Sequence, residues 1–210
     1  MPGCTVFLGP SCDLETARAI LPDAAFRPPA ARGDIALAAA DGASVIVLID
    51  GVFLQDCAVG HREVLGVLRS GVIVVGASSM GALRAAELDA FGMVGVGEVY
   101  RRYRSGELES DDEVALVYDP ESGYALSEPL VNVRATIEAA VGDGAIAPAD
   151  ADAVLAAAQS LYFPERTWPA ILRRAAVPDA VREGLARRPP VDLKRADAVA
   201  ALEYARGLQA

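Results

Sequence analysis

The stretch G-V-I-V-V-G-A-S-S-M-G-A-L-R-A-A-E-L, residues 71–88, decides the fold class of this chain. Four consecutive β-branched residues, Val72 to Val75, predict a buried strand bounded by glycines. From Met80 onward the residues are strong helix formers, so a strand passes almost directly into a helix. The turn between them carries two adjacent hydroxyl groups, those of Ser78 and Ser79.

This serine pair has two interpretations. The run A-S-S-M-G at 77–81 differs by one residue from the G-x-S-x-G nucleophile elbow, with alanine at the first glycine position. In that motif a serine Oγ projects above a sheet, and free amides at the helix start receive a developing oxyanion. The alternative is that Ser78 or Ser79 caps the helix, which is a common use of serine. Taken by itself, the segment favours the cap.

The first half of the chain alternates strand and helix signals throughout. The pattern predicts strands at 5–8, 24–27, 45–49 and 72–75, and helices at 13–21, 34–40, 61–69 and 80–90. Continuous apolar strands in such an alternation are typical of the α/β class, here a Rossmann-like parallel sheet flanked by helices on both faces.

Ligand sites in open α/β sheets lie beyond the carboxyl ends of the strands. Three of these ends are rich in glycine, hydroxyl or carboxyl groups: 9–11, 50–53 and 76–79. Gly9 and Ser11 could approach a substrate, although a strand-to-helix turn also favours such residues. Asp50 could orient a base or accept loop amides, and ordinary Asp-Gly turn chemistry is the alternative. Their convergence predicts a site at this edge.

The second half of the chain has a different pattern. A glycine-rich segment at 91–97 precedes a short helix at 99–103 and a strand at 114–118, and everything after residue 132 is helical. The expected helices are 133–141, 148–161, 168–175, 178–187 and 194–208, punctuated by prolines. We therefore expect an α/β core at 1–130 and a helical C-terminal segment at 131–210 packed on that core.

Composition excludes several classes of function. The net charge of −10, from 29 acidic residues against 19 Lys and Arg, argues against nucleic acid as a partner. No uncharged apolar run approaches the ~18 residues that cross a bilayer, so no membrane association is expected. The amino terminus leads into a strand without a basic segment, which favours a cytoplasmic protein over a secreted one. The cysteines, Cys4, Cys12 and Cys57, are expected to be buried hydrophobic residues rather than metal ligands or disulfides.

The acidic segment at 107–113 raises a magnesium hypothesis, but nothing in the sequence makes its side chains converge. A solvated surface is the simpler interpretation, so no metal and no cofactor are predicted. Arg101, Arg102 and Arg104 lie just upstream, and the mixed charge could form a docking surface for a protein partner.

An ordered set of motifs resembles the core of the TfuA-like protein family. The set runs F-L-G-P-S (7–11), P-P-A-A-R-G-D-I (28–35), I-D-G-V-F (49–53), H-R-E-V-L (61–65), G-A-S-S-M-G-A-L-R-A-A-E-L (76–88), G-M-V-G-V-G-E-V-Y (92–100), D-D-E-V-A-L-V-Y (111–118) and L-S-E-P-L-V-N-V-R-A-T (126–136). Each motif alone is weak, whereas their order and spacing over about two thirds of the chain are specific.

The resemblance implies a role in peptide backbone thioamidation. Proteins of this family act beside YcaO-type enzymes, which use ATP to activate a peptide amide for replacement of its oxygen by sulfur. The TfuA-like partner is associated with hydrolysing the C-terminal thiocarboxylate of a ubiquitin-like sulfur carrier protein, which releases sulfide. It is also associated with helping the YcaO enzyme engage its peptide substrate.

The family's hydrolase-like site is described as a serine–lysine pair. The resemblance places its serine at Ser79, with Ser11 and Ser78 as rivals. We expected the lysine within the H-R-E segment, where Arg62 stands instead. Arginine is a poor general base because it stays protonated at neutral pH, and Lys194, the sole lysine, lies outside the matched motifs.

Other residues receive roles from their chemistry. His61, the only histidine, could accept the serine proton, and a core-facing structural histidine is the alternative. Arg62 could orient a thiocarboxylate through its planar fork, or be a solvated surface residue. The Met80 amide would help to hold the oxyanion. Arg84, with Glu87 three residues later, could bind substrate or form a helix ion pair.

The resemblance, carried onto these residues, implies an accessory hydrolase in which Ser79 attacks a carrier thiocarboxylate. The alternative is a non-catalytic adaptor that binds the YcaO enzyme and positions its peptide. A nucleotide-binding domain is a weaker hypothesis, because no phosphate-binding glycine motif follows a strand.

Overall fold

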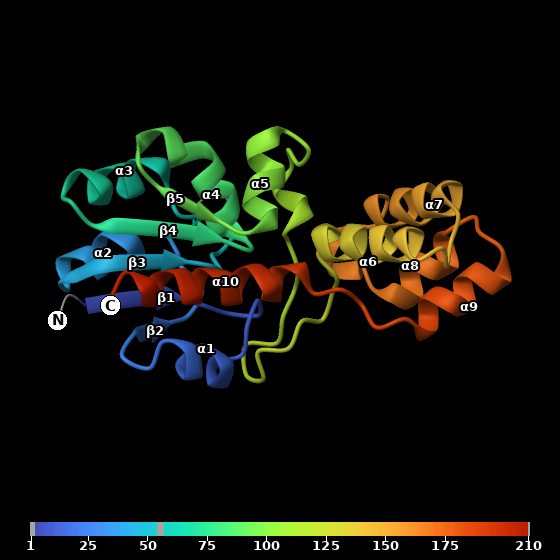
Figure 1. The fold of residues 1–210 in the computed structure, drawn as a ribbon, viewed down its shortest axis with the longest axis horizontal. Coiled ribbons are helices and arrows are strands. Elements are labelled where there is room, and N and C mark those ends of the chain that lie inside the picture. The colour runs from blue at the N-terminus through green and yellow to red at the C-terminus, as the bar shows by residue number, and fades with distance from the viewer. Residues whose placement is uncertain (1–2, 54–56, 210) are drawn as a thin grey trace. The chain divides into compact units, whose positions relative to one another are not determined.

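The computed structural model describes residues 3–53 and 57–209, and within them a five-stranded parallel sheet forms the centre of the fold (Figure 1). The strands are β1 (Gly3–Phe7), β2 (Ala25–Arg27), β3 (Ala43–Leu48), β4 (Ile73–Ala77) and β5 (Val94–Val96), in the order β2-β1-β3-β4-β5. The expected Rossmann-like α/β class is confirmed.

Side chains alternate across the sheet, and each face has its own core. Val6, Val47 and Val75 pack on one face together with α1 (Leu14–Ile20) and α10 (Leu193–Gly207). Phe7 and Leu48 pack on the other face with residues of α2 (Asp34–Ala40), α3 (His61–Arg69) and α4 (Met80–Leu88). Figure 1 shows these three helices on that side of the sheet. Both faces are covered, which explains why the strands are apolar throughout.

The fifth strand was not expected, because its sequence contains glycine. Gly95 lies at the centre of β5, and a Cβ there would come within 2.2 Å of the Tyr100 ring. Tyr100 belongs to α5 (Glu98–Ser105), which follows the strand after Gly97. The glycine therefore allows an aromatic ring to cover the edge strand, and a propensity-based prediction misses this.

Contacts divide the chain into two compact units. The first comprises residues 1–111 together with 194–210, and the second comprises 112–193. This division differs from the expected one at residue 130, because α10 joins the α/β unit. Four fully buried residues of α10, Ala198, Ala201, Leu202 and Ala205, belong to the core beneath β1, β3 and β4.

The second unit is helical and has its own core. Its α-helices are α6 (Leu130–Gly142), α7 (Pro148–Gln159), α8 (Trp168–Arg174) and α9 (Asp179–Arg187). The strand expected at 114–118 is wrong: Tyr118 makes one isolated bridge to Ala125. The N–H of Val117 donates to Ser127 Oγ at 2.9 Å, so a side chain replaces a strand neighbour.

Two residues of the acidic segment at 107–113 form ion pairs within the second unit. Glu113 accepts two hydrogen bonds from the Arg134 guanidinium, at 2.9 and 2.7 Å. Asp112 accepts one at 2.6 Å from Arg166, which is completely buried. No helix in the described ranges is long and apolar enough to cross a membrane.

Candidate active site

The turn from β4 to α4 brings helix and sheet backbones into contact. A Cβ on Gly81 would lie 1.7 Å from the Leu48 carbonyl oxygen, and one on Gly76 would lie 2.1 Å from the Gly81 carbonyl oxygen. Only glycine fits at these two positions. The first turn of α4 therefore lies directly on the ends of β3 and β4, and the Gly81 N–H donates to the Ile49 carbonyl at 3.2 Å.

Ser78 occupies the strained position of this turn. It is the one non-glycine residue with positive φ, 66°, in the described part of the chain. Its side chain is fully buried, and its Oγ has no hydrogen-bond partner among the described residues. Left-handed backbone conformation and an unpaired buried hydroxyl both cost free energy, and such strain concentrates at functional sites.

Ser79 stands at the N-cap position of α4 but does not cap it. Its φ and ψ are −121° and −126°, and its side chain makes no capping hydrogen bond. The Met80 N–H donates no hydrogen bond to any described residue, so one amide at the start of this nine-residue helix is available. The simple cap interpretation of the serine pair thus finds no hydrogen bond to support it.

Asp50 connects the ends of β3 and β1. Its buried carboxylate accepts the N–H of Gly9 at 2.9 Å, the N–H of Ser11 at 3.1 Å and the Ser11 hydroxyl at 2.7 Å. The three residues named as substrate-binding candidates therefore meet, as their positions predicted. They bind one another, which fixes the β1–α1 loop.

The loop after Asp50 also reaches the serine turn. A Cβ on Gly51 would lie 2.8 Å from the Met80 Cγ, so glycine permits Met80 to pack against this loop. By strand register, Phe7 pairs with Leu48 and Leu48 pairs with Gly76. Gly9, Asp50 and Ser78 each follow these positions by two residues, so they stand at the same level along the carboxyl edge of the sheet.

His61 lies away from the serine turn. Its Nε2 is 2.8 Å from a Glu87 carboxylate oxygen, and that carboxylate also binds the Arg84 guanidinium at 2.5 Å. Glu87 follows Ser79 by eight residues, about 12 Å along the α4 axis. The side chain of His61 is half exposed. The structure therefore does not bring this imidazole to the serines.

Arg84 and Arg62 differ in their surroundings. Arg84 also donates from Nε to the Val59 carbonyl at 2.8 Å, so it joins α4 to the loop before α3. The expected ion pair of Arg84 with Glu87 is confirmed. Arg62 is exposed on α3, whereas its neighbour Glu63 accepts the amides of Gly33 and Gly60 at 2.8 Å each.

The start of α10 carries three charged residues that the structure places against the α/β unit: Lys194, Arg195 and Asp197. Lys194 is 2% exposed, an unusual environment for lysine. The next residue, Arg195, contacts Asp13 Oδ2 at 2.7 Å and Thr16 Oγ1 at 3.0 Å, at the start of α1. Asp13 caps α1, and hydrogen bonds from Thr16 together with Arg195 lower the pKa of Asp13 to about 2.

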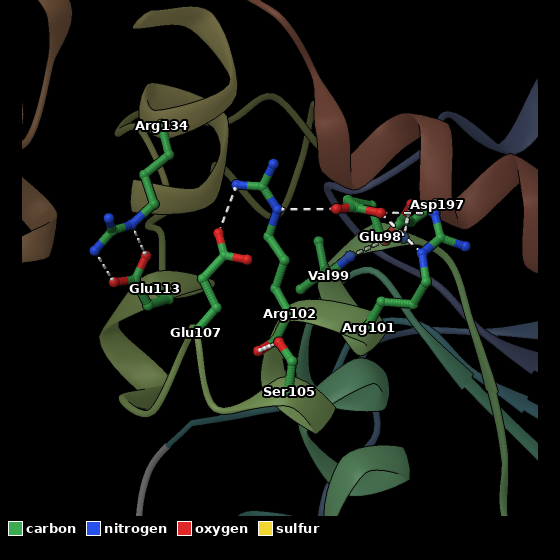
Figure 2. A network of polar contacts seen from close by, with 9 residues as sticks. All are labelled: Glu98, Val99, Arg101, Arg102, Ser105, Glu107, Glu113, Arg134 and Asp197. Carbon is green, nitrogen blue, oxygen red and sulfur yellow. Dashed lines mark hydrogen bonds and ion pairs between the residues drawn. The ribbon is translucent and has the colours of Figure 1, made fainter. Parts of the chain in front are cut away.

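Asp197 attaches the same turn to α5. Its carboxylate accepts the N–H of Glu98 at 2.8 Å and the N–H of Val99 at 2.7 Å, as Figure 2 shows. A Cβ on Gly97 would lie 2.2 Å from Asp197 Cγ, so glycine is required before α5. Burial raises the pKa of Asp197, and the two amides oppose that shift.

The cysteines and the acidic side chains remain to be placed in the structure. Within 3–53 and 57–209, no three His, Cys, Asp or Glu side chains converge as metal ligands. Cys4 and Cys12 are buried, and burial raises the pKa of Cys4 to about 11. Cys57 is exposed, which corrects the expectation that all three cysteines are buried.

Comparison with known proteins identifies a family over more than half of the chain. A family model described as TfuA-like protein matches residues 50–167. No curated protein matches the chain. The matched residues include Asp50, the serine turn and His61, whereas the β1–α1 loop and α10 lie outside them.

Proposed function

Because the chain belongs to the TfuA-like family, we propose that it hydrolyses the thiocarboxylate of a ubiquitin-like sulfur carrier and delivers sulfide to a YcaO-type enzyme. The family indicates a role in thioamidation-associated processes. The hydrolytic step is our inference, and the observation that carries it is Ser78: a buried, unpaired hydroxyl in a strained strand-to-helix turn.

Ser78, rather than Ser79, is the nucleophile in this proposal. The motif can be aligned as G-A-S-S-M from Gly76, which puts Ser78 at the serine of a nucleophile elbow. In such elbows the serine stands in a strained turn directly after a strand, which is the position that Ser78 occupies after β4. Ser11 is not assigned this role because it lacks the left-handed backbone of Ser78 and its hydroxyl is part of the Asp50 contacts that fix the β1–α1 loop. The Met80 amide supplies a donor for the developing oxyanion.

Lys194 is the proton acceptor in this proposal. The contacts of α10 with α1 and α5 put its first turn at the carboxyl ends of β1 and β5, and β3 and β4 lie between these strands. The turn therefore spans the ends that carry Asp50 and Ser78. A lysine amine is one of the side-chain groups that act as general bases in enzymes. Catalytic hydrogen bonds commonly form only when substrate is bound.

The chemistry balances without a cofactor. The Ser78 oxygen attacks the thiocarboxylate carbon, its proton passes to Lys194, and the C–S bond breaks. The departing sulfide takes that proton from Lys194 and leaves as HS⁻. The carrier carbonyl carbon is then joined to the Ser78 oxygen as an ester. Water then hydrolyses the ester, releasing the carrier carboxylate and a proton and restoring the serine.

The test follows sulfide release from a thiocarboxylated carrier protein. We expect Ser78→Ala to abolish release and Ser79→Ala, its matched neighbour, to retain most of it. Lys194→Ala should lower the rate by about 100-fold or more, and added propylamine should restore part of that loss. Equal rates for wild type and Ser78→Ala would rule out the nucleophile.

A second role as a peptide-positioning adaptor is favoured by the helical unit. A cavity of about 420 Å³ lies between α6 and α7. Its lining combines apolar residues such as Ile137, Val141 and Leu155 with the charged Arg134, Glu138 and Asp152. Its volume is within the range of sites that hold small ligands or side chains. If Ser78→Ala supports full thioamidation when free sulfide is supplied, the adaptor role is separate from hydrolysis.

A further inference from the structure

The start of α10 is held at two points by the side chains of Arg195 and Asp197, which are two residues apart. Asp197 receives two backbone amides from α5, and both of its carboxylate oxygens are used. Gly97, the N-cap residue of α5, offers no side chain, so Asp197 supplies the cap from 99 residues away. Figure 2 shows this carboxylate at the start of α5.

The second attachment faces α1. The Arg195 guanidinium reaches the Asp13 carboxylate and the Thr16 hydroxyl with different nitrogens, at 2.7 and 3.0 Å. Both partners belong to the capped start of α1, where Asp13 in turn binds the Thr16 N–H at 2.7 Å. A planar guanidinium bound at two atoms fixes direction as well as distance.

These attachments determine where Lys194 lies. Lys194 and Asp197 are three positions apart, so they share one side of α10. Asp197 is bound at the end of β5 and Arg195 at the end of β1, on opposite sides of the two central strands. The helix can neither rotate nor slide without breaking one attachment, and Lys194, which is buried, moves with it.

We propose that Arg195 and Asp197 are positioning residues that hold Lys194 at the central strand ends, so that α10 completes the active site of the α/β unit. The inference rests on the proposed function, because it assigns Lys194 the role of proton acceptor. Lys194, Arg195 and Asp197 all lie outside residues 50–167, the segment that the family model matches.

The experiment measures kcat and KM for sulfide release from a thiocarboxylated carrier with the full chain. Arg195→Gln and Asp197→Asn should each lower kcat by about 10- to 100-fold, because small displacements of a catalytic group are costly. The KM should not change, since neither residue is assigned to carrier binding. Arg195→Lys should recover part of the loss. Arg206→Gln is the matched control: it removes an ion pair with Glu203 at the other end of α10 and should leave kcat unchanged.

A double-mutant cycle separates positioning from general stabilisation. If the two residues act through Lys194, Lys194→Ala with Arg195→Gln will be no slower than Lys194→Ala alone. Rates that multiply instead would overturn the proposal. Melting temperatures identify a variant that fails to fold, in which case the Arg195→Lys series decides by the same criterion.

The rates of the variants distinguish an error in the positioning role from an error in the proposed hydrolase function. If Ser78→Ala and Lys194→Ala are inactive while Arg195→Gln and Asp197→Asn keep the wild-type kcat, only the positioning role is wrong. If Ser78→Ala retains the wild-type rate, the hydrolase itself is wrong and the positioning role falls with it.

Discussion

Two strand-to-helix turns of the same sheet carry a serine, and they satisfy it in opposite ways. After β1, the hydroxyl and amide of Ser11 both donate to Asp50, and α1 has a complete cap in Asp13. After β4, Ser78 has a left-handed backbone and an unpaired buried Oγ, and α4 has no side-chain cap. In the β1–α1 turn these polar groups are paired, and the pairing stabilises the fold. The second turn leaves the Ser78 Oγ unpaired on a strained backbone, and this is the group that the proposed hydrolase would use as its nucleophile.

The largest expected difference between the two turns is in activity. Ser78→Ala should reduce sulfide release by about 1,000-fold or more, because it removes the attacking oxygen. Ser11→Ala should remain within a fewfold of wild type, because its hydroxyl is engaged by Asp50. The measurement is single-turnover sulfide release from a thiocarboxylated carrier. A larger loss in Ser11→Ala would reverse the assignment of the two turns.

The next effect concerns the stability of the β1–α1 turn. Asp50→Ala should lower the free energy of unfolding by about 3 kcal/mol, because it leaves the buried amides of Gly9 and Ser11 without an acceptor. Asp50→Asn retains one acceptor oxygen and should cost less. Urea unfolding gives both values, and a loss below about 1 kcal/mol for Asp50→Ala would show that this carboxylate is not the structural centre of the turn.

A gain in stability is expected at the β4–α4 turn. Ser78→Gly relieves the positive φ and removes the orphaned hydroxyl, so the inactive variant should be more stable than wild type by about 1 kcal/mol. Denaturant unfolding measures the gain. A destabilised Ser78→Gly would mean that the turn holds no strain and that the contrast with Ser11 is unfounded.

The smallest effect distinguishes the two helix starts. Asp13→Ala should cost about 1 kcal/mol at pH 7, whereas Ser79→Ala should change stability by less than about 0.5 kcal/mol. The lowered pKa of Asp13, about 2, makes its contribution present above the unfolded value near 4 and lost as the pH falls from 4 through 2. Urea curves of wild type and Asp13→Ala should therefore converge as the pH falls through that window. A difference that persists at the lowest pH would assign the cost to something other than the charged cap.

Local sequence patterns were sufficient for much of the fold. The helices at 34–40 and 61–69 have the expected bounds, since their periodicity and punctuation are encoded nearby. The meeting of Gly9, Ser11 and Asp50 also followed from strand ends in a parallel sheet. The strand at 94–96 was not predicted because glycine is rare in strands. Gly95 is required there because the Tyr100 ring packs against it, and this contact is not visible in the local pattern.

Features set by distant contacts could not be predicted. The choice between Ser78 and Ser79 depends on a φ of 66°, and serine as a residue type does not signal such a conformation. The assignment of α10 to the α/β unit depends on packing across nearly the whole chain. In sequence, Lys194 and Asp197 resemble ordinary solvated charges of a terminal helix, and only tertiary contacts show that they are buried.

The single lysine of the chain has a practical consequence for measurement. Every other positive side chain at neutral pH is a guanidinium, apart from His61 when protonated. The only amines that an acylating reagent can modify are therefore the α-amino group and the Nζ of Lys194. Since that amine is 2% exposed, its labelling requires the first turn of α10 to open. The labelling rate of Lys194 in the native protein would thus report how often this local opening occurs. Mass spectrometry can follow it without any engineered probe.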